Sequence, residues 1–218
     1  MNANWNSQDK FNREASKWDE NPQRRALALS VSRAMINTIK PDYSMNVLEF
    51  GCGTGLVTLQ IAPLVKHLSA VDTSNEMLVV LQDKIRASGI TNIETRCRNL
   101  SLSSGSDFPE KSFELIYGSM TLHHIDDTAE FLKRISGLLS PGGILAIADL
   151  DLEDGLFHDD SQEKVHPGFD RGELTALFYN AGLQTRSFET IDTIHKTSRS
   201  GVDASYPVFL SVTSRNNP

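Results

Sequence analysis

The sequence predicts an α/β domain built on a mostly parallel β-sheet. From Asn46 onward, strand-like apolar runs alternate with helix-like amphipathic runs, which is the pattern of repeated β-α-β units. The first strand-like run ends in a glycine-rich turn at residues 51–55 (GCGTG), after which a helix-like run begins. Towards the end of the sequence, two strand-like runs follow one another with no helix between them. Strands joined in this way are normally antiparallel neighbours.

Composition narrows the class of protein. The chain has 218 residues, of which 39% are apolar, so we expect one large domain or a domain with a small lid. A formal net charge of −7 does not favour binding to the negatively charged phosphate backbone of a nucleic acid. Nucleic acid is therefore not the expected substrate. No apolar run approaches the roughly 18–20 residues of a membrane span, and no signal peptide is recognised. Cys52 and Cys97 make no disulfide framework, which predicts reduced thiols and a cytoplasmic location. The oligomeric state is left open.

The segment before the first strand, residues 1–45, is predicted to be helical. Phe11, Ala15 and Trp18 recur at helical spacing, and a second amphipathic run covers residues 24–39. One interpretation is simple packing on the core. The other is a lid that folds over a ligand site.

The remaining elements follow in order, with local signals at several boundaries. Ser74 and Asp170 are expected to cap helix N-termini, and Gly89 is expected to end the helix that Ser74 begins. Residues 141–143 (PGG) are expected to form a turn, and residues 149–168 a polar, acidic loop. The expected strands are 47–50, 68–72, 93–97, 113–117, 144–148, 185–193 and 207–213. The expected helices between them are 56–64, 74–88, 128–139 and 170–182.

The glycine turn and the acidic residue after it suggest a ligand site. Three glycines at alternate positions allow positive φ and remove side chains where the backbone passes close to a ligand. Such a turn lies at the carboxyl edge of the sheet, where α/β proteins usually bind ligands. Asp72 ends the second strand, where a carboxylate can accept hydrogen bonds from a ribose diol. For the glycine turn, the alternative is a tight turn that binds no ligand. For Asp72, the alternative is a carboxylate that is only stabilised by the dipole at a helix N-terminus.

Residues 49–55 (EFGCGTG) resemble the nucleotide-binding motif of class I S-adenosylmethionine-dependent methyltransferases, and the resemblance extends over residues 11–211. It implies a Rossmann-like three-layer sandwich, with a seven-stranded, mostly parallel sheet whose last strand is antiparallel. It also implies an N-terminal helical lid at residues 1–45 and a methyltransferase domain at residues 46–218. The cofactor would be S-adenosyl-L-methionine.

The resemblance also implies which residues hold that cofactor. Asp72 would bind the ribose, with Thr73 and Met77 lining the ribose and adenine pocket. Gly118 would place a backbone carbonyl near the methionine amino group. The family usually has an aspartate where this chain has Asn99, whose amide oxygen can still accept a hydrogen bond. The full implied set is Glu49, Gly51, Cys52, Gly53, Thr54, Gly55, Asp72, Thr73, Met77, Asn99, Leu100 and Gly118.

Residues 117–125 (YGSMTLHHI) resemble the Leu-His-His stretch that is common in small-molecule methyltransferases. The sulfonium makes the methyl group electrophilic, so the protein mainly positions the reactants for in-line displacement, and a general base is optional. If a base acts, the candidates are His123 and His124, because histidine titrates near working pH. The alternative is that one of the pair only makes hydrogen bonds at the start of a helix.

The loop at residues 149–168 is expected to border the acceptor pocket. It contains His158 and His166 among several aspartates, but no tight ligand spacing such as His-x-x-x-His, so we predict no metal. The loop is interpreted mainly as a solvated acidic segment.

We therefore expect an enzyme that methylates a small-molecule acceptor, without contact to nucleic acid or membrane. The atom that receives the methyl group is not identified by the sequence. Two alternatives remain. One is a non-catalytic S-adenosylmethionine-binding protein. The other is a nicotinamide-dependent oxidoreductase, which is opposed by the glycine spacing, by Gly118-Ser119 and by the two final strands.

Overall fold

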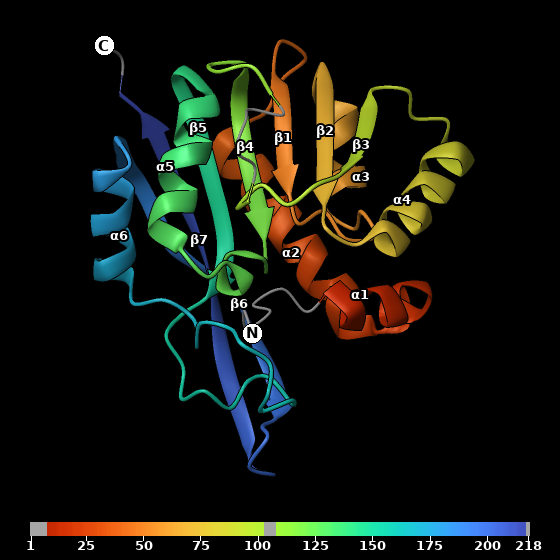
Figure 1. The fold of residues 1–218 in the computed structure, drawn as a ribbon, viewed down its shortest axis with the longest axis vertical. Coiled ribbons are helices and arrows are strands. Elements are labelled where there is room, and N and C mark those ends of the chain that lie inside the picture. Colours follow the sequence, from red (N-terminus) through yellow and green to blue (C-terminus); the bar gives the residue numbers. More distant parts are fainter. Residues whose placement is uncertain (1–7, 103–107, 217–218) are drawn as a thin grey trace.

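The computed structural model describes residues 8–102 and 108–216, and it has the predicted α/β architecture (Figure 1). Seven strands form one sheet in the order β3-β2-β1-β4-β5-β7-β6. Strands β1 to β5 pair in parallel, whereas β7 pairs antiparallel with both β5 and β6, so the predicted antiparallel last strand is confirmed. The strands are β1 (Asn46–Phe50), β2 (His67–Asp72), β3 (Ile93–Cys97), β4 (Phe113–Ser119), β5 (Leu139–Leu150), β6 (Leu183–Thr197) and β7 (Asp203–Arg215).

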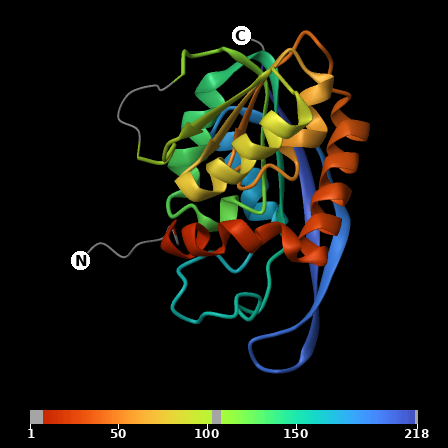
Figure 2. The same ribbon diagram turned by 90° about the vertical axis from the view of Figure 1, so that its right-hand side faces the viewer.

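Helices cover both faces of the sheet and complete the three layers (Figures 1 and 2). They are α1 (Gln8–Glu14), η1 (Ala15–Glu20), α2 (Pro22–Ile39), α3 (Thr58–Ile61), η2 (Ala62–Leu64), α4 (Asn75–Ser88), η3 (Leu122–His124), α5 (Thr128–Leu138) and α6 (Arg171–Asn180), where η denotes a 3₁₀ helix. Successive strand residues point to opposite faces. Val47 therefore joins the apolar cluster under α2, α3 and α4, and Leu48 joins the one under α5 and α6.

The predicted caps are found at the helix ends. The Ser74 hydroxyl accepts from the backbone N–H of Met77 at 3.2 Å, and Gly89, with φ of 68°, ends α4. The Asp170 carboxylate accepts from the backbone N–H of Glu173 at 2.9 Å at the start of α6. These local bonds satisfy helix-end groups that have no partner within the helix.

Several element boundaries differ from the prediction, most clearly in the following regions. The helix expected at residues 56–64 is only one turn of α-helix and a 3₁₀ turn, because Pro63 lacks the N–H that a continuing α-helix needs. The expected turn at residues 141–143 lies inside β5, where Gly142 at φ of 75° accompanies a register shift between β4 and β5. Strands β6 and β7 are longer than expected and form a hairpin that projects beyond the rest of the sheet (Figure 1).

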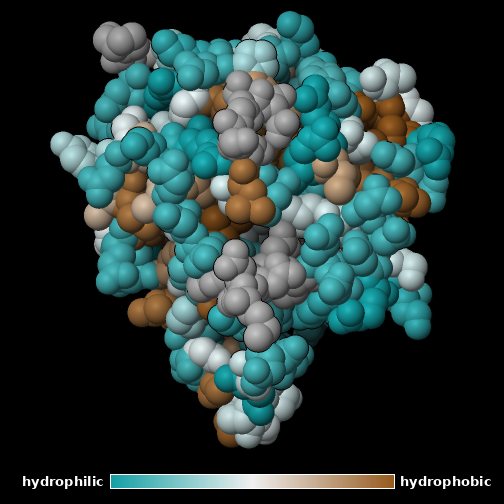
Figure 3. Space-filling view, viewed as in Figure 1, coloured by the Kyte–Doolittle hydropathy of each residue, from teal (hydrophilic) through white to brown (hydrophobic). Residues whose placement is uncertain are grey.

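The N-terminal elements run along the carboxyl edge of the sheet. In Figure 2, α1 and η1 pass below the ends of the parallel strands before α2 turns up along one face. On the face shown in Figure 3 hydrophilic residues predominate and apolar ones are scattered. Within residues 8–102 and 108–216, no helix has both the length and the apolar character that crossing a bilayer requires.

Candidate cofactor and acceptor site

One cavity of about 930 Å³ lies at the carboxyl edge of the sheet, under α1 and η1. The ends of β1, β2 and β4 form its floor, and η3 and the loop after β5 form its far wall. Most of the residues singled out in the sequence line it, and the structure thus brings together positions that are far apart in the chain. These are Glu49, Gly51, Cys52, Gly53, Thr54, Asp72, Thr73, Met77, Asn99, Leu100, His123 and His124.

The glycine turn leaves bare backbone at the cavity. Gly51, Gly53 and Gly55 have φ of 65°, 52° and 83°, values that favour glycine. A Cβ at Gly51 would lie 2.2 Å from the Thr121 hydroxyl oxygen. A Cβ at Gly53 would meet no described atom within 4 Å. The middle glycine therefore borders open space, whereas the first is required by packing against Thr121.

Two predicted glycines, Gly55 and Gly118, do not line the cavity. A Cβ at Gly55 would lie 2.3 Å from the Leu81 side chain, and one at Gly118 would lie 2.3 Å from the Phe50 ring. Both glycines permit close packing behind the cavity wall. A role for either in binding a cofactor stays a prediction.

Asp72 connects the glycine turn to α4. Its two carboxylate oxygens accept from the backbone N–H groups of Gly53 at 2.7 Å and Ser74 at 2.8 Å. Burial raises the pKa of Asp72, and these backbone hydrogen bonds oppose that rise. Each carboxylate oxygen can accept a second hydrogen bond. Asp72 can therefore also bind a ligand hydroxyl while it holds the turn.

Glu49 is a buried carboxyl group beneath the turn. It accepts hydrogen bonds from the hydroxyl groups of Thr58 at 2.5 Å and Tyr117 at 2.9 Å. Burial raises its pKa to about 8, so the group is mostly protonated at neutral pH when no cation lies beside it. Asn99, at the other side of the cavity, uses its amide oxygen to accept from the backbone N–H of Ser101 at 2.9 Å.

His123, on η3, forms a buried pair with Asp149. The distance from Nδ1 of His123 to a carboxylate oxygen of Asp149 is 2.6 Å, and the two side chains are 2% and 0% exposed. Asp149 also accepts from the backbone N–H groups of His123 and Leu150. Since the carboxylate is an acceptor, Nδ1 carries the hydrogen, and Nε2 of a neutral imidazole keeps a lone pair. The geometry is that of a base oriented by a carboxylate.

The role of Asp149 corrects the sequence prediction. Asp149 was expected in a solvated loop, but it belongs to β5 and is fully buried. Its position directly after the apolar run at residues 144–148, at the ligand-binding edge of the sheet, was the signal that could have found it. Because β5 lies next to β4 in the sheet and η3 follows β4, Asp149 at the end of β5 lies beside His123 of η3.

Two further imidazoles adjoin His123. The ring centroids of His124 and His158 lie 4.2 Å and 5.1 Å from that of His123. Burial, together with His123 and His158, lowers the pKa of His124, which is therefore neutral. Among the described residues, neither Nδ1 of His124 nor Nε2 of His158 has a hydrogen-bond partner, although both atoms are buried.

The other loop histidine, His166, does not line the cavity. Its Nε2 lies 2.8 Å from the backbone oxygen of Ile125, and its backbone N–H donates to the backbone oxygen of His123, so it holds the loop against η3. Within the described ranges, no group of three or more histidine, cysteine or acidic side chains is arranged to hold a metal ion.

The N-terminal segment is tied to the cavity at several points. Asp19 accepts from the Thr54 hydroxyl at 2.6 Å and pairs with Lys84. Lys10 pairs with Glu163 of the opposite loop at 2.7 Å. The Phe11 ring packs edge-on against His124 with centroids 5.2 Å apart. These contacts close the cavity from above.

Glu163 connects the N-terminal segment to the histidine cluster, because it contacts both Lys10 and His158. Its side chain is 1% exposed, and its Oε2 lies 2.7 Å from the Lys10 ammonium and 3.4 Å from Nδ1 of His158. Burial acts to raise the pKa of Glu163, but hydrogen bonds from His158 and Lys10 outweigh burial and lower it. No local pattern in the sequence predicted this contact, because it joins residues 153 positions apart.

Further residues of the cavity wall were not singled out as site residues in the sequence, although Trp18 belongs to the predicted lid and residues 149–168 were expected to border the acceptor pocket. Aromatic and aliphatic side chains enter from η1, α2, the loop and the hairpin, and basic ones accompany them. The additional residues are Trp18, Arg24, Leu27, Met120, Phe157, Glu163, Ile194 and Lys196. Met120 has φ of 52°, which is unusual for a residue other than glycine and is a feature often found at functional sites.

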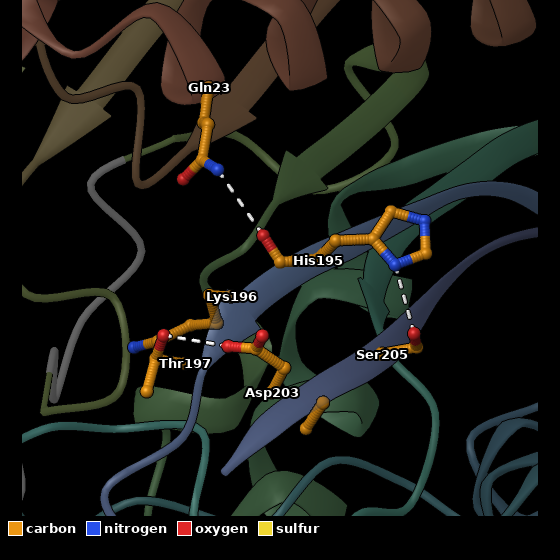
Figure 4. Close-up of a pocket in the computed structure, with 7 residues that line it drawn as sticks. Gln23, His195, Lys196, Thr197, Asp203 and Ser205 are labelled. Carbon is orange, nitrogen blue, oxygen red and sulfur yellow. Dashed lines mark hydrogen bonds between the residues drawn. The ribbon is translucent and has the colours of Figure 1, made fainter. Parts of the chain in front are cut away.

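A second hollow, of about 540 Å³, lies between α2 and the β6–β7 hairpin (Figure 4). Its polar groups bond to one another. Gln23 donates to the backbone oxygen of His195 at 3.2 Å, the His195 ring lies 2.9 Å from the Ser205 hydroxyl, and Thr197 donates to Asp203 at 2.9 Å. The hydrogen bond from Gln23 attaches the hairpin to α2, and we assign no ligand to this hollow.

Comparison with known proteins agrees with the fold and the cavity. A family model described as a methyltransferase domain matches residues 48–147. An uncharacterised methyltransferase of Schizosaccharomyces pombe is 30% identical over 190 residues, which are 82% of this chain and 66% of that protein. An O-methyltransferase of Aspergillus nomiae is 28% identical over 188 residues, 80% of this chain and 81% of that protein. The crystal structure of an S-adenosylmethionine-dependent methyltransferase from Aquifex aeolicus superposes with a TM-score of 0.67 at 18% identity, covering 94% of this chain and 98% of that one.

The fold and the site define a Rossmann-like nucleotide-binding domain with its ligand site at the carboxyl edge of the sheet. Residues 48–147 match a methyltransferase domain, and most of the chain is similar to methyltransferases in sequence and to an S-adenosylmethionine-dependent methyltransferase in fold. The recognition made from residues 49–55 is thereby confirmed. The chain spans about two thirds of the length of the yeast relative.

Proposed function

We propose that this protein transfers a methyl group from S-adenosylmethionine to a hydroxyl group of a small molecule. The observation that carries the proposal is a single cavity with two chemically different ends: the glycine turn and Asp72 at one, and the His123–Asp149 pair at the other. The first end suits a nucleoside, and the second suits an acceptor that must lose a proton.

The residues at the first end fit the cofactor. Open space at Gly53 leaves room for the amino-acid end of S-adenosylmethionine beside bare backbone. Asp72 would accept from the ribose hydroxyls, and Met77 and Leu100 would flank the adenine, with the Asn99 amide at its edge. Glu49 would lie near the cofactor's ammonium group, which favours its charged form.

At the second end, the protein's own residues supply orientation and a base. When bound, S-adenosylmethionine supplies a methyl group that is already electrophilic, so positioning contributes most of the catalysis. The acceptor hydroxyl would give its proton to Nε2 of His123. Asp149 would hold the imidazole in the correct orientation and stabilise the imidazolium that forms.

Of the N-terminal segment expected at residues 1–45, residues 1–7 lie outside the described residues; residues 8–45 would act as a lid over the domain that begins at residue 46. Contacts of Asp19 with Thr54 and of Lys10 with Glu163 support this role, since they span the cavity from the first end to the second. A closed lid would exclude water from the reacting atoms. Two free cysteines and the charge balance continue to predict a cytoplasmic location and an acceptor that is not nucleic acid.

Two experiments test the proposal. Calorimetric titration with S-adenosylmethionine, S-adenosylhomocysteine and NAD should show binding of the first two only. Binding of NAD alone would contradict the proposal. Incubation with methyl-labelled cofactor and a metabolite extract should then label a small hydroxyl compound. Tight cofactor binding without label transfer across a broad extract would favour the non-catalytic alternative.

A further inference from the structure

We propose that His124 and His158 bind a second oxygen of the acceptor, next to the hydroxyl that faces His123. The acceptor would then be an uncharged compound with two neighbouring oxygens, such as a catechol or an enol beside a carbonyl. This inference rests on the proposed function and names the substrate class for the same site.

The first observation is the pair of unsatisfied ring nitrogens. Nδ1 of His124 and Nε2 of His158 are buried and lack a partner among the described residues, and both side chains line the cavity. Buried polar atoms in folded proteins nearly always have a hydrogen-bond partner, and leaving one without is costly. A ligand oxygen in the cavity is the partner that would satisfy them.

The second observation is how closely the three rings are grouped. The centroids of His124 and His158 are 5.7 Å apart, and both lie within about 5 Å of His123. Their positions are fixed by other contacts. His158 is held by Glu163 at 3.4 Å, and His124 is packed against Phe11. Three positioned imidazoles in one place match two oxygens on adjacent carbon atoms better than one isolated hydroxyl.

The charges around the rings favour an uncharged ligand. Asp149 pairs with His123, Glu163 pairs with Lys10, and Asp159 pairs with Lys196 at 2.7 Å. Glu163 and Asp159 thus already have lysine partners, both of which are engaged, and Asp149 is hydrogen-bonded to the His123 imidazole. A carboxylate or phosphate on the acceptor would be placed beside Glu163 without a new counter-charge.

The rest of the cavity wall near the histidines is largely apolar. Phe11 and Trp18 come from the N-terminal segment, Leu27 from α2, Phe157 from the loop and Ile194 from the hairpin. Such a wall suits a flat, apolar ring or chain. Together with the imidazoles, it favours an aromatic or enolic compound that carries both oxygens at one end.

The experiment compares catechol with phenol as probes. Each is titrated calorimetrically into the whole protein saturated with S-adenosylhomocysteine. One additional pair of hydrogen bonds to buried groups should make catechol bind about tenfold more tightly than phenol. His124→Phe and His158→Phe keep the ring volume and should remove this preference while changing phenol affinity little. His195→Phe, outside the cavity, is the matched control and should keep the preference.

Equal binding of catechol and phenol by the unmodified protein would overturn the inference without any variant. So would failure of catechol to bind, or a preference that survives both substitutions. Saturation with S-adenosylhomocysteine is verified by its own titration. Absence of selectivity in the unmodified protein, with cofactor binding intact, therefore overturns this inference alone, whereas absent cofactor binding overturns the proposed function as well.

Discussion

The two ends of the cavity are built in different ways. The cofactor end is made of backbone and short-range contacts, such as Gly53 with Asp72, which are 19 positions apart. The acceptor end is made of side chains from the N-terminal segment, η3, the loop and the hairpin, as in the contact of Lys10 with Glu163 across 153 positions. The difference indicates that related enzymes can share the cofactor end, which depends on backbone. The specificity for the acceptor can change through substitutions of the side chains at the acceptor end.

The largest expected effect separates the two ends directly. His123→Asn should lower kcat by roughly 10²–10⁴-fold, because it removes a general base from the acceptor end. Affinity for S-adenosylhomocysteine should stay unchanged, since His123 lies at the far end of the cavity. Single-turnover rates and calorimetry measure the two quantities. An unchanged kcat would show that the acceptor needs no base and would remove the chemical distinction between the ends.

The reciprocal change is Asp72→Ala at the cofactor end. It should cost about 2–3 kcal/mol in affinity for S-adenosylmethionine, because charge-assisted hydrogen bonds are lost. At saturating cofactor, kcat should change little. Asp72→Asn is the control that keeps one acceptor oxygen and should lose less affinity. Equal binding by the alanine variant and the parent would refute the ribose assignment.

A third prediction concerns pH and the buried carboxyl of Glu49. Its folded-state pKa of about 8 lies above its ordinary value of 4.5, so the folded protein binds more protons than the unfolded chain between these values. Stability of the ligand-free protein should therefore fall as pH rises through this window, by at most about 1.4 kcal/mol per pH unit from this group.

Glu49→Gln should flatten that slope, as measured by urea unfolding at several pH values. S-adenosylmethionine carries an ammonium group, so its binding should release a proton near neutral pH in the parent protein and not in the variant. Calorimetry in buffers of different ionisation enthalpy detects this release. Identical pH slopes for parent and variant would contradict the assigned protonation state.

The smallest effect is expected from the closure between the ends. Lys10→Met removes an ion pair whose lysine is 33% exposed, so screening limits the loss to about 1 kcal/mol or less. The KM for the acceptor should rise up to about fivefold, with cofactor affinity nearly unchanged. Lys17→Met, on the same segment but outside the cavity, is the control. A larger effect on cofactor affinity than on the KM for the acceptor would contradict our assignment of the Lys10–Glu163 contact to the acceptor end of the cavity.

Several features were predictable because they depend on neighbouring residues. Ser74 and Asp170 cap helices through backbone groups two or three positions away, and Gly89 ends α4 through its own φ. Errors occurred where contacts at longer range decide. Asp149 was expected in solvent because it begins an acidic run, yet the buried partner that determines its place is His123, 26 positions earlier.

The sequence by itself determined the order of strands and helices, the bare backbone at residues 51–55 and the carboxylate at residue 72. Periodicity, glycine conformation and helix capping are local properties, and local properties can be recognised in a single chain. Only the tertiary structure decided that His123 is held by Asp149, that His124 and His158 lie beside it, and that Lys10 reaches Glu163. Those contacts exist because the sheet brings distant segments to one edge, where burial strengthens the interactions between their polar groups.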